Sequence, residues 1–192
     1  MMIKMFNEFK LKMLNKEASS PKNKPAKIIK SLNIKRGMVI GDIGSGGGYF
    51  SSKFSTKVGE QGQVYAIDVN QKFLNFIGES IRKSKIKNVK TVLADVNGPD
   101  LPDNSVNLFF LRNVFHHLPK PAEYFKNIEK ILEDNGKIAI IDYKKKKFSF
   151  AGLFGHYTPE NVLIDIMSEV GFYPIEKHDF LPDQLFVIFQ KR

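Results

Sequence analysis

The 192-residue chain has room for one domain with a sizeable core, and its 42% of hydrophobic residues is ordinary for a globular protein. No apolar run approaches the roughly 20 residues that span a bilayer. Charged residues interrupt the N-terminal segment where a secretory signal would be apolar, so we expect a cytoplasmic protein. The lack of cysteine excludes disulfides, thiolate nucleophiles and cysteine-ligated zinc, and four scattered histidines predict no metal site.

The net charge of +10 comes mostly from lysines spread along the chain. A lysine-rich proteome explains such an excess, although a nucleic acid or a membrane surface would also suit it. The densest run is Lys144–Lys147. Its default interpretation is a solvated loop, and its alternative is a contact for an anionic partner.

Apolar periodicity predicts the elements in chain order. Residues 2–15 carry Met2, Phe6, Phe9 and Met13 at helical spacing, which predicts an amphipathic helix that packs on the domain or forms a lid. A polar break over residues 17–24 follows, so residues 1–24 are an N-terminal helix and linker. From Pro25 onward, helices alternate with apolar strands. The strands are predicted at residues 38–43, 63–69, 89–93, 106–111 and 137–143, and the later helices at 48–57, 73–83 and from 121.

The last third of the chain changes character. Thr158 and Pro159 are expected to cap a helix that Gly171 ends, and residues 172–180 and 185–190 form a hairpin without a helix between its strands. Residues 25–192 are therefore predicted as one Rossmann-like α/β domain. Its mostly parallel seven-stranded sheet has helices on both faces and a C-terminal antiparallel hairpin. Ligands in such sheets bind beyond the carboxyl ends of the strands.

A glycine-rich turn follows the first strand at residues 42–48 (Asp-Ile-Gly-Ser-Gly-Gly-Gly). Glycines let the backbone approach a nucleotide-like ligand, and the next helix begins there with free N–H groups. The dinucleotide fingerprint starting at Gly44 would require a small residue where Tyr49 stands, and the Gly-Lys-Ser/Thr of a phosphate loop is absent.

Acidic residues also end the next two strands. A carboxylate at Asp68 can accept both hydroxyls of a ribose, a feature that nicotinamide enzymes share. Asp95 ends the third strand. Each acid alone could be a helix cap or a turn residue. Their recurrence at successive strand ends favours a nucleoside site.

Asp42 followed by alternating glycines resembles the first motif of class I S-adenosylmethionine-dependent methyltransferases, whose acid at the Asp95 position meets the adenine amino group. Residues 109–118 (Phe-Phe-Leu-Arg-Asn-Val-Phe-His-His-Leu) are similar to the ubiquinone/menaquinone-biosynthesis methyltransferase group, with Phe110 in place of a glycine. The resemblance covers about residues 25–190. It implies S-adenosylmethionine as cofactor, S-adenosylhomocysteine as product, and the following cofactor-binding residues: Asp42, Gly44, Ser45, Gly46, Gly48, Asp68, Val69, Asp95, Val96, Arg112 and Asn113.

The implied reaction is methyl transfer by in-line displacement to a small-molecule or lipid-like acceptor, without a metal. The protein mainly aligns the reactants, and it needs a base if the nucleophile carries a proton at pH 7. Candidate bases are His116, His117 and Tyr143. These three residues and His156, which matches a Gly-His pair of relatives, are the expected substrate-pocket residues.

Other functions stay open from the sequence. The chain could methylate RNA or protein through its basic surface, it could bind S-adenosylmethionine without catalysis, or it could be a nicotinamide oxidoreductase. Arsenite and cytosine-C5 methylation both use cysteine, which is absent, and the Asn/Asp-Pro-Pro-aromatic motif of adenine-N6 enzymes does not occur after the fourth strand. A small-molecule or lipid-like acceptor is therefore the favoured interpretation.

Overall fold

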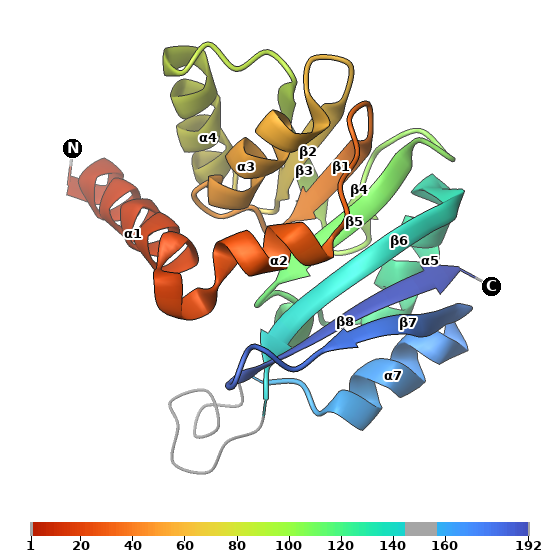
Figure 1. The fold of residues 1–192 in the computed structure, drawn as a ribbon. Coiled ribbons are helices and arrows are strands. Elements are labelled where there is room, and N and C mark those ends of the chain that lie inside the picture. Colours follow the sequence, from red (N-terminus) through yellow and green to blue (C-terminus); the bar gives the residue numbers. More distant parts are fainter. Residues whose placement is uncertain (1, 145–156, 192) are drawn as a thin grey trace. The chain divides into compact units, whose positions relative to one another are not determined.

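The computed structural model describes residues 2–144 and 157–191. The chain forms two compact units, Met1–Ala94 and Asp95–Arg192 (Figure 1). None of the helices in these described ranges is long and apolar enough to cross a membrane.

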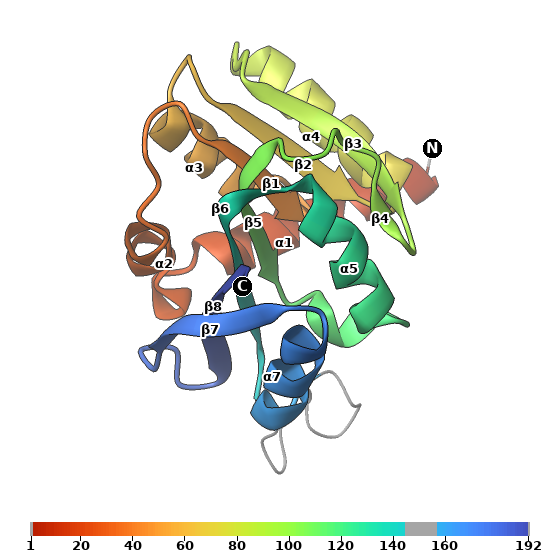
Figure 2. The same cartoon turned by 90° about the vertical axis from the view of Figure 1, so that its right-hand side faces the viewer.

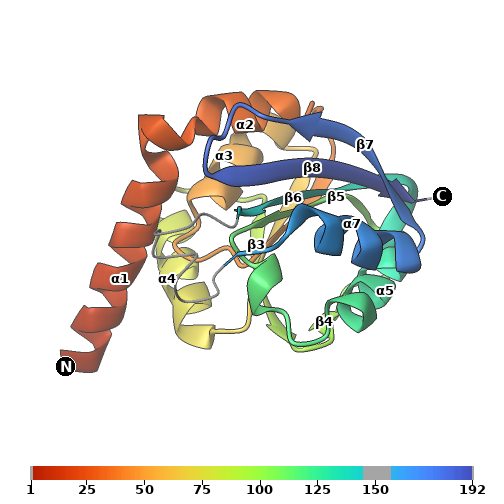
Figure 3. The same ribbon diagram turned by 90° about the horizontal axis from the view of Figure 1, so that it is seen from below.

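The first unit combines three parallel strands with four helices. Strand β2 lies between β1 and β3, and Asp42 pairs with Ala66 while Asp68 pairs with Leu93. Figure 3 shows α1 beside α3 and α4, which it contacts. The elements are α1 (Met2–Ser19), a 3₁₀ turn (Pro21–Asn23), α2 (Pro25–Ser31), β1 (Val39–Ile43), α3 (Tyr49–Val58), β2 (Gln63–Asp68), α4 (Gln71–Lys83) and β3 (Val89–Asp95).

Local sequence explains where these elements form. Most apolar residues of β1 and β2 are almost fully buried, as in parallel strands covered on both faces: Ile40, Ile43, Val64, Ala66 and Ile67. Helix α4 begins where the side chain of Asn70 accepts a hydrogen bond from the Lys72 N–H at 3.0 Å. Leu74 and Ile77 form its buried face. The elements predicted from apolar periodicity in this unit are therefore confirmed, with ends that differ by a few residues.

Helix α1 is present as predicted, but its packed face is not the predicted one. Leu11 is 1% exposed and Ala18 is also buried, whereas Phe9 and Met13 are 63% and 56% exposed. Leu11 and Ala18 are seven residues apart and so share one side of the helix. The helix therefore packs on α3 and α4 as predicted, but the stripe that includes Phe9 and Met13 lies on another side and is not the packed face.

The second unit contains a mixed set of strands. Strand β6 pairs in parallel with β5 and antiparallel with β8, and β7 pairs antiparallel with β8. Helix α7 packs against β7 (Figure 2). The elements are β4 (Gly98–Pro99), β5 (Val106–Arg112), a 3₁₀ turn (Phe115–His117), α5 (Pro121–Ile131), β6 (Leu132–Tyr143), α7 (Glu160–Glu169), β7 (Phe172–His178) and β8 (Gln184–Lys191).

The predicted Rossmann-like α/β class is confirmed, with eight strands in the described residues rather than seven. The additional strand is β4, whose two residues are too few to show a period of two. Strand β6 also begins earlier than expected. Its register with β5 moves from Val106↔Leu132 to Leu108↔Lys137, so the residues just before the predicted start at 137 form an irregularity within the strand.

Candidate cofactor-binding and catalytic residues

The glycine-rich turn joins β1 to α3 in the first unit. Gly46 and Gly48 have φ angles of +53° and +81°, in the left-handed region that favours glycine. A Cβ on Gly48 would lie 3.0 Å from the Ile77 side chain of α4, so a side chain there would be both strained and crowded. The N–H groups of Gly44 and Ser45 both donate to the Ile67 carbonyl oxygen, at 2.9 and 3.0 Å. These bonds tie the turn to β2.

Asp42 lies buried at the end of β1, where the Ser51 hydroxyl of α3 donates to its carboxyl at 2.5 Å. Burial raises the pKa of Asp42 from 3.8 to about 7. Hydrogen bonds from Ser51 offset part of this rise, and the charge of Asp68 adds to it. The observed contacts of Asp42 therefore link β1 to α3.

Asp68 is brought against the turn, 22 positions from Gly46. Its Oδ2 accepts the Gly46 N–H at 3.1 Å, and its Oδ1 accepts the Asn70 N–H at 3.0 Å. Burial raises the pKa of Asp68, and these two N–H groups, followed by Val69 and the charge of Lys10, act in the opposite direction. Val69 beside it is exposed. Two of the predicted cofactor-binding residues, Gly46 and Asp68, are thus in direct contact.

Three features of the turn are compatible with a nucleoside-containing ligand. Buried Asp68 supplies a carboxylate for hydroxyl groups, and Gly46 has no Cβ to fill the space beside it. The Ser45 hydroxyl is buried and has no hydrogen-bond partner in the part of the chain that the structure describes. Buried hydroxyls normally have partners, so this one fits a site whose ligand completes it.

The cofactor-binding residues predicted in the second unit lie at the ends of β3 and β5. Asp95 is exposed, and its Oδ1 accepts the Asn97 N–H at 2.7 Å in a local turn. Val96 is exposed as well. Arg112 ends β5, and Asn113 follows with a φ of +58° while its side-chain oxygen accepts a hydrogen bond from Gln184 at 2.6 Å. Cofactor contacts of these residues stay predictions.

His116 forms a close pair with Asp142, which the sequence analysis did not identify. Nδ1 of His116 lies 2.6 Å from Oδ1 of Asp142, and the two side chains are 5% and 0% exposed. The His116 backbone N–H also donates to Oδ2, at 3.0 Å. A signal for Asp142 was available, because it is an acid near the carboxyl end of an apolar strand, as are Asp42, Asp68 and Asp95.

The Asp142 carboxylate accepts two further hydrogen bonds. Oδ1 accepts the Tyr143 N–H at 2.8 Å, and Oδ2 accepts the Thr158 hydroxyl at 2.8 Å. Oδ2 thus accepts two hydrogen bonds, and Oδ1 accepts one in addition to its contact with Nδ1 of His116. In the tautomer whose Nδ1 donates to this carboxylate, Nε2 is the acceptor of the neutral ring. Thr158 does not cap α7 as expected, since α7 begins after Pro159 with no side-chain cap.

The other candidate residues differ in how far the structure describes them. The ring of exposed His117 lies 4.0 Å from that of His116, and the ring of Tyr143 lies 6.5 Å from it, measured between centroids. His156 and residues 145–147 of the lysine run lie outside the described residues. No group of three or more potential metal ligands occurs within residues 2–144 and 157–191.

Residues 34–170, which are more than half of the chain, match the model of the methyltransferase domain family. The chain belongs to this family. A solved structure of an S-adenosylmethionine-dependent methyltransferase from Aquifex aeolicus is 28% identical, with a TM-score of 0.83 over 92% of this chain and 96% of that one. A second solved methyltransferase structure, from Methanococcus maripaludis, shares the fold at 20% identity and a TM-score of 0.73, over 94% and 91%.

The ubiquinone/menaquinone biosynthesis C-methyltransferase of Yersinia enterocolitica is 26% identical over 113 residues, which are 58% of this chain and 45% of that protein. The matched region therefore spans less than half of this curated relative. Together these similarities identify a class I S-adenosylmethionine-dependent methyltransferase. The family expected from the sequence is confirmed. The similarities favour a methyltransferase over the alternative of a nicotinamide oxidoreductase.

Replacing residues of the turn tests its role in cofactor binding. We expect Asp68→Ala to weaken S-adenosylhomocysteine binding at least about tenfold, because a hydrogen bond to a charged group is worth about 1.5–3 kcal/mol. We expect a similar loss for Gly46→Val, because a valine at a φ of +53° is strained and adds bulk to the turn. Isothermal titration calorimetry measures this affinity. Asp165→Ala, which removes an exposed carboxylate on α7, is the control. Wild-type affinity in both turn variants would refute the assigned site.

The raised pKa of Asp42 predicts a pH dependence of folding. The folded state keeps a proton that the unfolded chain releases above pH 3.8, so stability falls as the pH rises toward 7. Relative to Asp42→Asn, we expect the wild type to lose about 2–3 kcal/mol of unfolding free energy between pH 5 and pH 8. Urea unfolding of both proteins at the two pH values measures the difference. Parallel pH profiles would show that Asp42 is not the cause.

Proposed function

We propose that this methyltransferase acts on a small apolar acceptor whose nucleophile carries a proton, with His116 as the general base. The observation that carries the proposal is the bond between Nδ1 of His116 and the buried Asp142 carboxylate. A carboxylate that fixes the Nδ1 tautomer leaves Nε2 able to accept a proton from an acceptor molecule. A phenol or an activated carbon acid has a proton of this kind.

S-adenosylmethionine, when bound, supplies a methyl group activated by a sulfonium. In the first unit, we propose that the Asp68 carboxylate binds the ribose hydroxyls and that the turn at Gly44–Gly48 lies against the rest of the ligand, with Ser45 as an additional polar contact. Asp68 is suited to this because its two oxygens are already oriented by the Gly46 and Asn70 N–H groups. The proposed task of the protein is to bind, to align and to remove one proton.

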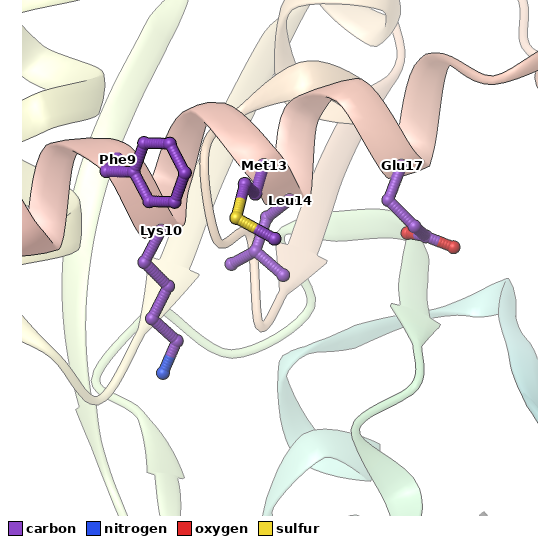
Figure 4. A pocket seen from close by; sticks show the side chains of 5 residues that line it. All are labelled: Phe9, Lys10, Met13, Leu14 and Glu17. Atoms are coloured by element: carbon purple, nitrogen blue, oxygen red, sulfur yellow. The ribbon is translucent and has the colours of Figure 1, made fainter. Parts of the chain in front are cut away.

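An apolar pocket on α1 supports the apolar nature of the acceptor. Phe9, Met13 and Leu14 line it together with Lys10 and Glu17, and its volume is about 510 Å³ (Figure 4). Exposed apolar side chains that adjoin one another mark binding surfaces more often than isolated ones do. Leu14 lies 3.5 Å from the Cβ position of Gly46, so the pocket adjoins the glycine turn.

The relatives agree with this class of acceptor. The Yersinia enterocolitica protein is named as a C-methyltransferase of ubiquinone and menaquinone biosynthesis. Methylation of carbon requires that a proton leave the acceptor, which is the step assigned to His116.

Labelled methyl transfer from S-adenosylmethionine into fractionated cell extract tests the acceptor class. We expect the label in the fraction that an organic solvent extracts, because the proposed pocket is apolar. RNA and protein are separated and counted in the same experiment. Label confined to RNA or protein would contradict a small apolar acceptor and would favour the basic surface as the substrate-binding region.

His116→Gln tests the base with the acceptor fraction so identified. We expect the rate of methyl transfer to fall by about 100-fold or more, since a positioned base contributes about 10²–10⁴, while S-adenosylhomocysteine affinity stays at the wild-type value. His117→Gln is the matched control, because His117 is the neighbouring but exposed histidine. A wild-type rate in His116→Gln, or an equal loss in His117→Gln, would exclude His116 as the specific base.

A further inference from the structure

Asn15 of α1 is hydrogen-bonded to the glycine turn, although more than 30 positions separate them. Its Nδ2 donates to the Gly47 carbonyl oxygen at 2.8 Å. Its Oδ1 accepts the Tyr49 N–H at 3.2 Å. The carboxamide therefore bridges two backbone groups on either side of Gly48.

The second bond gives α3 a cap that its own sequence does not supply. Tyr49 is the first residue of α3, and Gly48 in the cap position has no side chain to accept from the first N–H groups. Helices usually satisfy these groups with a nearby Ser, Thr, Asp or Asn. In this chain, Asn15 from another helix accepts the Tyr49 N–H instead.

The side chain of Asn15 requires a glycine at position 47. Gly46 and Gly48 have positive φ angles, but Gly47 does not. A Cβ on Gly47 would overlap with the carboxamide atoms of Asn15. The need for glycine at position 47 therefore comes from the side chain that bonds to it.

The bonds of Asn15 complete the hydrogen bonding of the turn. The N–H groups of Gly44 and Ser45 donate to Ile67, that of Gly46 to Asp68, and that of Gly48 to the Ser45 carbonyl oxygen. With the Tyr49 N–H held by Asn15, the N–H of Gly47 is the one in residues 44–49 without a partner among the described residues. Asn15 holds the carbonyl oxygen of that same residue.

We propose that Asn15 is a positioning residue for cofactor binding: its two bonds fix Gly47 and Tyr49 so that the turn is ready for the ligand and the Gly47 N–H is kept available to an acceptor atom of the cofactor. This inference rests on the proposed placement of S-adenosylmethionine at the turn. In this proposal, α1 lines one side of the cofactor site. Two other residues of α1 belong to the same side: Leu14 lies beside Gly46, and the charge of Lys10 lowers the pKa of Asp68.

Asn15→Ala removes both bonds without adding bulk. We expect the affinity for S-adenosylhomocysteine to fall about tenfold, as the loss of two ordinary hydrogen bonds predicts. Leu11→Val is the matched control, because Leu11 is buried on the same helix and its apolar side chain makes no hydrogen bond to the turn. It should lower the urea midpoint to a similar extent and leave the affinity within about twofold of the wild type.

A double-mutant cycle with Gly47→Ala separates positioning from general stability. The added methyl group displaces the Asn15 side chain, so we expect Gly47→Ala alone to weaken binding about as much as Asn15→Ala. In the double variant the clash is gone, and binding should be no weaker than in Asn15→Ala. Such non-additivity is the signature of two groups in contact. Additive losses would show that the two residues act independently.

The outcomes distinguish this inference from the proposed site. If Gly46→Val and Asp68→Ala weaken S-adenosylhomocysteine binding but Asn15→Ala leaves it unchanged or tightens it, the positioning role of Asn15 is wrong and the site stands. If none of the three variants changes the affinity, the cofactor site itself is misplaced. An equal loss of affinity in Leu11→Val would also overturn the inference, because the effect would then follow from the stability of α1.

Discussion

The backbone groups of residues 44–49 need hydrogen-bond partners, and the proposed cofactor site depends on how that need is met. A turn rich in glycine has no side chains of its own to hold its shape, and its left-handed residues cost entropy on folding. Partners from β2 and α1 supply the missing order, through Ile67, Asp68 and Asn15. The turn can thus stay free of side chains on the ligand side and still adopt one conformation.

In the second unit, distant partners likewise satisfy a buried group, the carboxylate of Asp142. Asp142 is fully buried, and burial of a carboxylate is costly unless hydrogen bonds compensate. Three donors do so, and Nδ1 of His116 is the fourth partner of the carboxylate. In the proposed mechanism, the same arrangement holds the Nδ1 proton of His116 and leaves Nε2 to accept a proton. Structural need and proposed catalysis therefore rest on the same contacts.

Much of the fold could be predicted from the sequence, because apolar runs and glycine turns are local signals. The glycine turn and the three strands β1, β2 and β3, which carry Asp42, Asp68 and Asp95 at or near their ends, could be predicted in this way. Strand β4 was not, since two residues have no periodicity. The packed face of α1 was predicted wrongly because hydrophobicity marks two sides of that helix, and only tertiary contacts decide that Leu11 is buried.

The site residues that the sequence did not reveal are those whose partners are distant along the chain. Asn15 is one polar residue within a helix, and nothing local distinguishes it from a solvent-exposed asparagine. Thr158 matched the pattern of a helix cap, yet its hydroxyl bonds to Asp142, 16 positions earlier. Such choices depend on which buried group needs a donor, and that is known only once the chain is folded.

A crystal structure of the protein with S-adenosylhomocysteine tests the central claim most directly. The account predicts that the ligand lies against the turn at residues 44–48, with its ribose hydroxyls on the Asp68 carboxylate and with the Asn15 bonds to Gly47 and Tyr49 intact. A ligand bound away from this turn, or a complex in which Asp68 contacts no part of it, would contradict the account.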